Sequence, residues 1–247
     1  MAELLVGRNP VREVLRAGRR RVEEVLLARG VQEKGIIAQI VQLCRERGIP
    51  LRRVERQQLD QRAKEKHQGV AALVSFYPYV DLAAILALAQ ERGELPFLLA
   101  LDSLQDPQNF GSLLRTAEAV GVHGVILPTR RSVQVTPAVV RASAGAVEHL
   151  LIARVTNLAR TLAGLKRQGI WVVGIEDHPQ AQDYRQVELD LAAVFVLGSE
   201  GQGMRRLVAE QCDWLLRIPM RGRINSLNVA VAGSIVLYRA FEAREEG

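Results

Sequence analysis

Polar side chains that could position or activate a substrate lie at three bends in the second half of the chain. Segment 106–111 carries Asn109 and is followed by Arg115, segment 197–204 carries Glu200, and segment 218–229 carries Ser226 and Asn228. Each segment joins an apolar stretch to a helical pattern, and its glycine, proline, asparagine or serine residues suit a sharply bent backbone. Because every bend also presents a polar side chain, the three bends predict a single ligand site.

The second bend holds Gly198, Gly201 and Gly203 between a strand and a helix. A dinucleotide-binding fingerprint needs the order G-x-G-x-x-G in the first strand–helix unit of a domain, whereas this run comes late and has another spacing. No Walker A motif is present. The glycines either only permit a tight turn or let the backbone approach a ligand, and their position around Glu200 favours the ligand.

Two of the polar residues also have purely structural interpretations. Arg115 falls on the polar face of its helix, where most arginines are solvated, although it follows Asn109 at a helix start that suits anions. Ser226 is expected to cap the last helix. It is not a hydrolase nucleophile, because no G-x-S-x-G motif surrounds it and no histidine is near it in the sequence.

From residue 97 onward, short apolar strands alternate with helices, a pattern typical of a parallel sheet with helices on both faces. Strands are expected near 97–102, 123–127, 150–154, 170–175, 193–197 and 214–218, and a long last helix is expected from Ser226. Ligands of such sheets bind beyond the carboxyl ends of the strands. The three bends lie at those ends.

The N-terminal part predicts a small α/β unit of its own. Asn9 is expected to cap a first helix with Pro10 at its first position and Gly18 at its end. The further expected elements are a strand near 22–28, a helix near 32–47, a strand near 50–54, a helix near 57–63 and a strand near 70–76. A linker over 77–95, with a helix from Asp81 to about Arg92, separates domain 1–76 from domain 96–247.

Positive charge is concentrated in the N-terminal part. Of the net charge of +6, residues 1–80 supply 16 Lys/Arg against 9 Asp/Glu (+7), and residues 81–247 supply 17 against 18 (−1). Such an excess indicates either phosphate contacts with a nucleic acid or solvated faces with mixed charge. The candidate cations are Arg16, Arg19, Arg20, Arg21, Arg52, Arg53, Arg62, Lys64 and Lys66.

Composition excludes several other classes of protein. The longest apolar run, 82–89, is far shorter than the ~20 residues of a membrane helix, and the acidic start is not a signal peptide, so we expect a cytoplasmic protein. Cys44 and Cys212 are isolated, which argues against a disulfide framework or a zinc site. The four histidines (His67, His123, His149 and His178) are scattered and have no metal-ligand spacing.

The three bends, in this order, resemble the three motifs of the SpoU/TrmH branch of the SPOUT methyltransferases. The similarity extends through 117–124, 142–146 and 154–160, and covers essentially residues 97–240. Residues 7–11 and 67–70 are similar to the substrate-binding domain of the ribosomal RNA members, especially the type that methylates a guanosine of large-subunit rRNA.

This resemblance implies transfer of a methyl group from S-adenosylmethionine to a ribose 2′-hydroxyl in RNA, without a metal. It also implies a deep trefoil knot in the C-terminal domain and a homodimer whose active site lies at the subunit interface. The partner would be ribosomal RNA. A tRNA methyltransferase, or a non-catalytic RNA-binding factor of ribosome assembly, is the alternative.

The resemblance also implies roles for individual residues. The catalytic positions would be Asn109, Arg115, Glu200, Ser226 and Asn228, and the cofactor-binding positions would be Leu197, Gly198, Gly201, Gly203, Ile218 and Leu227. A guanidinium group is almost never deprotonated in proteins. We therefore expect Arg115 to bind the flanking phosphate and to stabilise the developing alkoxide.

Overall fold

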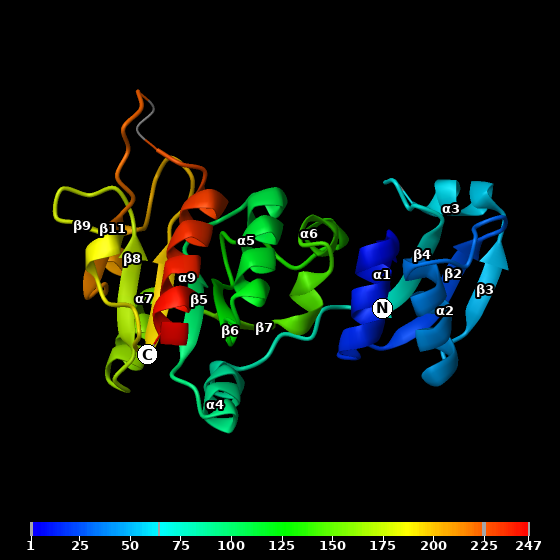
Figure 1. Cartoon of the computed structure of the whole chain (residues 1–247), viewed down its shortest axis with the longest axis horizontal. Coiled ribbons are helices and arrows are strands. Elements are labelled where there is room, and N and C mark those ends of the chain that lie inside the picture. Colours follow the sequence, from blue (N-terminus) through cyan, green and yellow to red (C-terminus); the bar gives the residue numbers. More distant parts are fainter. Residues whose placement is uncertain (1, 64, 224–225, 247) are drawn as a thin grey trace. The chain divides into compact units, whose positions relative to one another are not determined.

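The computed structural model of the chain describes residues 2–63, 65–223 and 226–246. It divides into two compact units. The first joins the residues up to Pro78 to the segment Gln134–His149, and the second contains Tyr79–Val133 and the chain from Leu150 onward. The sequence pattern predicts a mixed α/β chain with a small N-terminal unit, and the structure has this organisation (Figure 1).

The first unit is built on a four-stranded sheet with the strand order β1-β4-β2-β3. Strands β2 and β3 are parallel, and β4 runs antiparallel to both of its neighbours. The elements are β1 (Ala2–Val6), α1 (Arg8–Ala17), β2 (Val22–Ala28), α2 (Ile36–Glu46), β3 (Leu51–Val54), α3 (Arg56–Arg62) and β4 (Val70–Ser75). All but β1 were predicted within a few residues.

The cap of α1 differs from the prediction. Gly7, not Asn9, occupies the N-cap position, and its φ of 103° is a conformation that glycine adopts without strain. Asn9 lies inside the first turn. Gly18 ends the helix as predicted, in the left-handed conformation, and its amide donates to the carbonyl of Val14.

Part of the chain that follows β6 completes the first unit. Helix α6 (Pro137–Ala142) and the 3₁₀ helix η1 (Ala146–His149) pack on α1, and α6 also packs on β1. Inside this contact the fully buried guanidinium of Arg20 forms ion pairs with Glu3 and with Glu148, whose side chain is also buried. An arginine that the sequence offered as a phosphate contact is therefore part of the core.

The second unit contains a seven-stranded parallel sheet with the order β7-β6-β5-β10-β8-β11-β9. Its strands are β5 (Phe97–Leu101), β6 (Gly124–Pro128), β7 (Leu151–Val155), β8 (Trp171–Ile175), β9 (Gln182–Asp183), β10 (Ala193–Leu197) and β11 (Trp214–Arg217). The predicted parallel sheet is confirmed. The short edge strand β9 is an addition.

Helices cover both faces of this sheet. One face packs on α4 (Leu82–Arg92), α7 (Leu158–Lys166) and α8 (Arg206–Ala209), through a core that includes Ile85, Leu162 and Val208. Helices α5 (Pro107–Ala119) and α9 (Val229–Glu246) lie side by side on the other face (Figure 1). A Cβ atom at Gly233 would press against Leu113 and Leu197, so glycine lets α9 approach both α5 and the sheet.

The last helix begins later than predicted, at Val229. Asn228 caps it, because its Oδ1 accepts hydrogen bonds from the amides of Ala230 and Val231 at 2.9 and 3.3 Å. Ser226 lies ahead of the cap in an irregular segment. Its neighbour Asn225 falls outside the described residues, and the trefoil knot that the resemblance implies stays a prediction.

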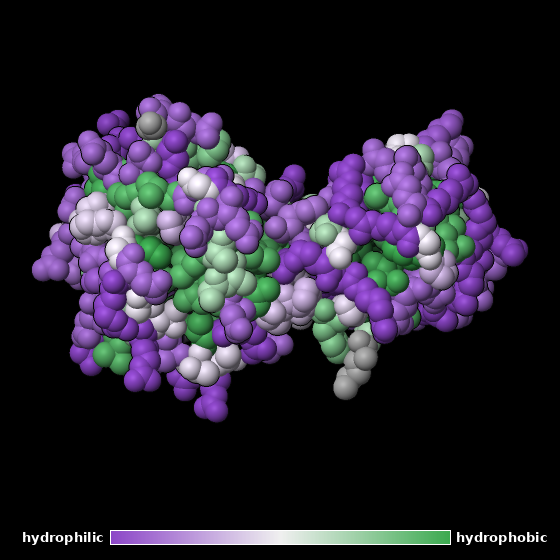
Figure 2. Space-filling model, turned by 90° about the horizontal axis from the view of Figure 1, so that it is seen from below, coloured by the Kyte–Doolittle hydropathy of each residue, from purple (hydrophilic) through white to green (hydrophobic). Residues whose placement is uncertain are grey.

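On the face shown in Figure 2, the surface of each unit is largely hydrophilic and is interrupted by hydrophobic residues. Within the described ranges, none of the helices combines the length and the apolar character that a membrane span requires.

Candidate active site

The loop that follows β10 is a tight bend stabilised by its own backbone. Ser199 and Gly203 exchange two amide–carbonyl hydrogen bonds of 3.0 Å, which leaves residues 200–202 at the tip. A Cβ atom at Gly198 would overlap the backbone of Gly203, and Gly203 itself has a φ of 65°. Gly201 also has a positive φ, of 78°, so all three glycines of this bend are required by its geometry.

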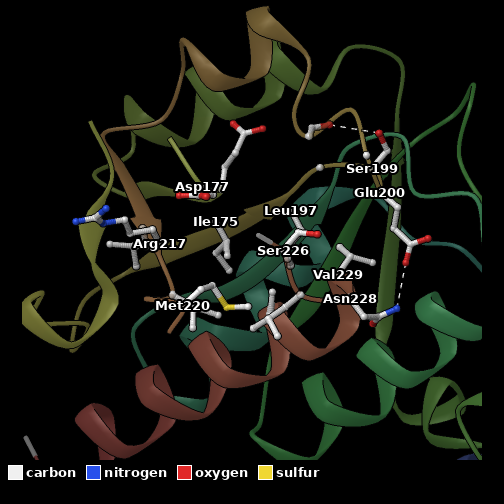
Figure 3. Close-up of a pocket in the computed structure, with 18 residues that line it drawn as sticks. Ile175, Asp177, Leu197, Ser199, Glu200, Arg217, Met220, Ser226, Asn228 and Val229 are labelled. Carbon is white, nitrogen blue, oxygen red and sulfur yellow. Dashed lines mark hydrogen bonds between the residues drawn. The ribbon is translucent and has the colours of Figure 1, made fainter. Parts of the chain in front are cut away.

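The tip of this loop meets the other two bends in a polar network, and Figure 3 shows its contact between Glu200 and Asn228. Asn109 Nδ2 donates to Glu200 Oε1, and Asn228 Nδ2 donates both to Asn109 Oδ1 at 2.8 Å and to Glu200 Oε1 at 3.1 Å. The three residues come from α5, from the loop after β10 and from the start of α9. The sequence predicted that the three bends form one site, and these contacts bring one polar residue from each bend together.

Asn109 is placed by the start of α5. Asp106 is the N-cap of this helix, its Oδ2 accepts a hydrogen bond of 2.9 Å from the Asn109 amide, and Pro107 occupies the first turn. The network therefore forms where two helices begin. Their amino ends are suited to an anionic group.

Next to the network lies a cavity of about 540 Å³, a volume typical of small-molecule sites. All six residues expected to bind the cofactor line it: Leu197, Gly198, Gly201, Gly203, Ile218 and Leu227. Ser226, Glu200 and Asn228 line it too; Figure 3 shows Glu200 and Asn228 together at one side of the pocket and Ser226 nearer its middle. The cavity lies at the carboxyl ends of β8, β10 and β11, where the fold predicts a ligand.

Arg115 lies apart from this group. It is exposed on α5, two turns beyond Asn109, and does not line the cavity. Across the described part of the chain, no hydrogen bond or ion pair of its side chain is found. The structure therefore leaves its guanidinium available to a ligand or to another chain.

The sequence interpretation missed several charged residues at the cavity. Glu176 and Asp177 follow β8 directly, and Arg217 ends β11. Met220 adds an apolar side chain. A signal for the two carboxylates was present, because they come directly after a predicted strand, at the edge of the sheet where ligands bind.

Cys212 is not among the residues that line the cavity. Burial raises the pKa of Cys212 to about 12, so its thiol stays protonated near neutral pH. Within the ranges 2–63, 65–223 and 226–246, no three His, Cys, Asp or Glu side chains are grouped so that they could hold a metal ion.

Most arginines of the first unit that were predicted to contact phosphate already have carboxylate partners. Arg21, Arg52 and Arg53 form ion pairs with Glu23, Glu24 and Glu33, respectively. Arg16 lies 3.6 Å from Glu13. Arg19 stacks on Tyr77 and donates to backbone carbonyls, and Lys64 lies outside the described residues.

Some cations of the first unit lack such a partner. Among the described residues, neither Arg62 nor Lys66 forms an ion pair with a carboxylate. Arg62 borders a cavity of about 160 Å³ between α3 and β3, together with Arg52, Gln58 and Gln61, over an apolar floor that includes Leu59.

Comparison with protein families assigns both parts of the chain. Residues 96–238 match the model of the SpoU rRNA methylase family. Residues 4–80 match the model of the RNA 2′-O ribose methyltransferase substrate-binding domain.

Related proteins and structures agree with these matches. The chain is 43% identical to YacO of Bacillus subtilis, named as a TrmH family tRNA/rRNA methyltransferase, over 98% of this chain and 96% of the relative. It is 44% identical to a protein of Staphylococcus aureus that is also named as a TrmH family tRNA/rRNA methyltransferase, over 98% of this chain and 97% of the relative. Among solved structures, the SpoU methyltransferase AviRb of Streptomyces viridochromogenes, in complex with AdoMet, matches with a TM-score of 0.82 and 25% identity over 100% of this chain and 92% of that one.

A further solved structure, an AdoMet-bound rRNA methyltransferase from Sinorhizobium meliloti, matches with a TM-score of 0.75 and 26% identity over 99% of this chain and 87% of that one. The family match spans the sheet, the cavity and the polar network described above. The chain therefore belongs to the SpoU rRNA methylase family of RNA methyltransferases.

Proposed function

We propose that this protein transfers the methyl group of S-adenosylmethionine to a ribose 2′-hydroxyl of RNA, with a guanosine of large-subunit rRNA as the target, in the cytoplasm. The observation that carries the proposal is the cavity beyond β8, β10 and β11, with the network of Asn109, Glu200 and Asn228 at its rim. A donor site beside a group of polar side chains is what methyl transfer to a hydroxyl requires.

The lining of the cavity fits S-adenosylmethionine. Leu197, Ile218 and Leu227 offer apolar surface to a purine ring, and the glycines of the loop allow close approach to the backbone. Asp177 places negative charge beside a cofactor that carries a sulfonium and an ammonium group. When bound, the cofactor supplies an electrophilic methyl group.

The protein's own residues then position the hydroxyl. Asn109 and Asn228 fix the orientation of Glu200, whose second oxygen stays available beside the cavity. Ser226 lines the cavity and offers a further hydroxyl. Arg115 would bind the phosphate next to the target ribose and stabilise the developing alkoxide, as a positively charged group does when it is held in place before the reaction.

A homodimer with the site at its interface follows from the same proposal. The exposed position of Arg115 supports it, because this residue does not reach the cavity within its own chain. Helix α9 and the segment before it also expose apolar side chains: Leu227 (37% exposed), Val231 (47%) and Tyr238 (47%). Light scattering after gel filtration should give twice the mass of the chain, and Val231→Glu should reduce it to that of a monomer.

The first unit would hold the RNA. The proposal rests on its match to a substrate-binding domain and on the cations near α3 for which no carboxylate partner is found among the residues that the structure describes. Phosphate contacts of this kind give affinity that depends on salt and not on sequence.

Transfer of labelled methyl from S-adenosylmethionine tests the proposal. Large-subunit rRNA should accept label, and resistance of one phosphodiester bond to alkali would identify the 2′-O-methylated nucleotide. Label in tRNA alone would support the tRNA alternative, which the names of the relatives also allow. Cofactor and RNA binding without transfer to any RNA would support a non-catalytic assembly factor and contradict the proposal.

A further inference from the structure

Two carboxylates flank the loop after β10, one from each neighbouring strand. Strand β10 lies between β5 and β8, and Leu197 is in register with Leu101 and with Ile175. The residue that directly follows β5 is Asp102, and the residue that directly follows β8 is Glu176. Both side chains therefore stand at the carboxyl edge of the sheet, beside the point where Gly198 begins the loop.

Each carboxylate accepts a hydrogen bond from one of two successive backbone amides. Glu176 Oε1 accepts from the Met204 amide at 3.0 Å. Asp102 Oδ2 accepts from the Arg205 amide at 2.8 Å, and its Oδ1 lies 2.8 Å from Nε and 2.6 Å from a terminal nitrogen of the Arg205 guanidinium. Asp102 is fully buried, so this contact is well shielded from solvent.

The two amides belong to the residues with which the loop ends. Gly198 to Gly203 therefore form a closed segment, held by β10 at its start and by the two carboxylates at its end. A Cβ atom at Gly203 would collide with Glu176 Oε1. Glycine at this position allows the carboxylate to reach the Met204 amide, so the glycine and the glutamate are parts of one arrangement.

The held segment serves both parts of the site. Gly198, Gly201 and Gly203 line the cavity, and Glu200 at the tip contacts Asn109 and Asn228. We propose that Asp102 and Glu176 are positioning residues, which fix the loop 198–203 so that it forms one wall of the cofactor cavity and carries Glu200 to the network. This inference rests on the proposed function in one respect only, the identity of the cofactor.

The inference is tested with two substitutions at each carboxylate, one that keeps a hydrogen-bond acceptor and one that removes it. Glu176→Gln keeps a carbonyl oxygen for the Met204 amide, whereas Glu176→Ala removes the acceptor. Asp102→Asn and Asp102→Ala form the second pair, and the Arg205 side chain, which is 48% exposed, can turn to solvent in either. Binding of S-adenosylmethionine is measured by titration calorimetry, and protection of the Met204 and Arg205 amides by hydrogen exchange.

Asp213→Ala is the matched control. The carboxylate of Asp213 also accepts a hydrogen bond from a backbone amide of the sheet, that of Val172 at 2.9 Å, but at the amino ends of the strands and away from the cavity. The Asp213→Ala variant should have a lower melting temperature than the wild type and the same dissociation constant for S-adenosylmethionine.

The alanine variants should raise this dissociation constant about tenfold, the effect of one lost hydrogen bond to a charged acceptor, and should expose the Met204 or Arg205 amide to exchange. Glu176→Gln should stay within about threefold of the wild type, because its acceptor is kept. Wild-type affinity in Glu176→Ala would overturn the inference. So would equal weakening by Gln and Ala, because the charge of Glu176 would then act on the cofactor directly.

The Glu176 pair decides the matter even if Asp102→Ala does not fold. Failure of the wild-type protein to bind S-adenosylmethionine would instead refute the proposed function, and amide exchange in the unliganded variants would still measure whether the carboxylates hold the loop.

Discussion

At the scale of single residues, Asn228 combines two tasks that can be separated. Its Oδ1 caps α9, and its Nδ2 donates to Asn109 and Glu200. Asparagine and aspartate cap helices about equally well, but aspartate has no donor and would repel the carboxylate of Glu200. The structural role and the proposed catalytic role should therefore respond differently to substitution.

We predict that Asn228→Asp keeps the melting temperature near that of the wild type and reduces methyl transfer by about two orders of magnitude. Asn228→Ala should lose activity and, because the cap is also lost, about 0.5–2 kcal/mol of stability. Thermal unfolding and single-turnover methyl transfer measure the two effects. An active Asn228→Asp enzyme would show that the donors of the network are dispensable.

Arg115 should behave in the opposite way, with no effect on the fold or on the cofactor. Its side chain is exposed and does not line the cavity. Arg115→Ala should leave binding of S-adenosylmethionine nearly unchanged and lower methyl transfer about a hundredfold or more, the loss expected when a charged group that stabilises the transition state is removed. Arg160→Ala, an exposed arginine on α7, is the matched control. Normal turnover in Arg115→Ala would refute the assignment.

At the scale of elements, the contact of η1 with α1 predicts a dependence of stability on pH. Burial raises the pKa of Glu148 from 4.5 to about 7, although Arg20 and Arg19 act against the shift. Between these values the unfolded chain releases the proton while the folded chain keeps it. The free energy of unfolding therefore falls as the pH rises through this window.

Glu148→Gln should remove this dependence. The stability of the wild type relative to Glu148→Gln should fall by on the order of 3 kcal/mol between about pH 4.5 and pH 7, and should then level off. The attraction between Arg20 and the ionised carboxylate is already included in the pKa of Glu148, so it adds no separate dependence on pH, and arginine itself does not titrate in this range. Urea unfolding of both proteins across this range measures the difference. A difference that stays constant with pH would contradict the prediction.

Most strands of the second unit could be predicted from the sequence. The strands from β5 to β8, β10 and β11 were predicted because each is a short Leu-, Ile- or Val-rich run bounded by turn residues. The starts of α1 and α9 were misplaced. Gly7 and Asn9 are both acceptable N-caps for α1, and Ser226 and Asn228 are both acceptable N-caps for α9. Contacts elsewhere in the fold decide between them: Asn228 is held by Asn109 and Glu200, both far away in the sequence.

Two other features could not be predicted, because they depend on contacts between segments that are far apart in the sequence. The roles of Asp102 and Glu176 depend on β10 lying between β5 and β8, an order that the chain sequence does not display. Arg20 read as a surface cation because its partner Glu148 lies far along the chain. The glycines around Glu200 could be predicted to form a ligand-binding loop. The conformational freedom of glycine is evident from the sequence alone, without knowledge of contacts elsewhere in the fold.

At the scale of the whole molecule, the proposed division of labour places RNA affinity in the first unit and chemistry in the second. About half of the basic residues described in the first unit are paired with carboxylates, so the number of basic residues overstates the surface available to phosphate. Affinity for RNA should then depend on a few cations, and each of these should contribute separately to the dependence of binding on salt.

Arg62 is the cation at which this can be measured. It borders the small cavity with Gln58 and Gln61, and no carboxylate partner is found for it in the described ranges. Arg62→Gln should weaken binding of an rRNA fragment and reduce the slope of log affinity against log salt by about 0.7–0.9, the value of one phosphate contact. Arg21→Gln removes the same charge from a residue that is already paired with Glu23 and is 77% exposed, so it should leave the slope nearly unchanged. Both variants should bind S-adenosylmethionine like the wild type. Equal slopes for the two variants would show that the first unit attracts RNA by its overall field, and that no defined phosphate contact exists at α3.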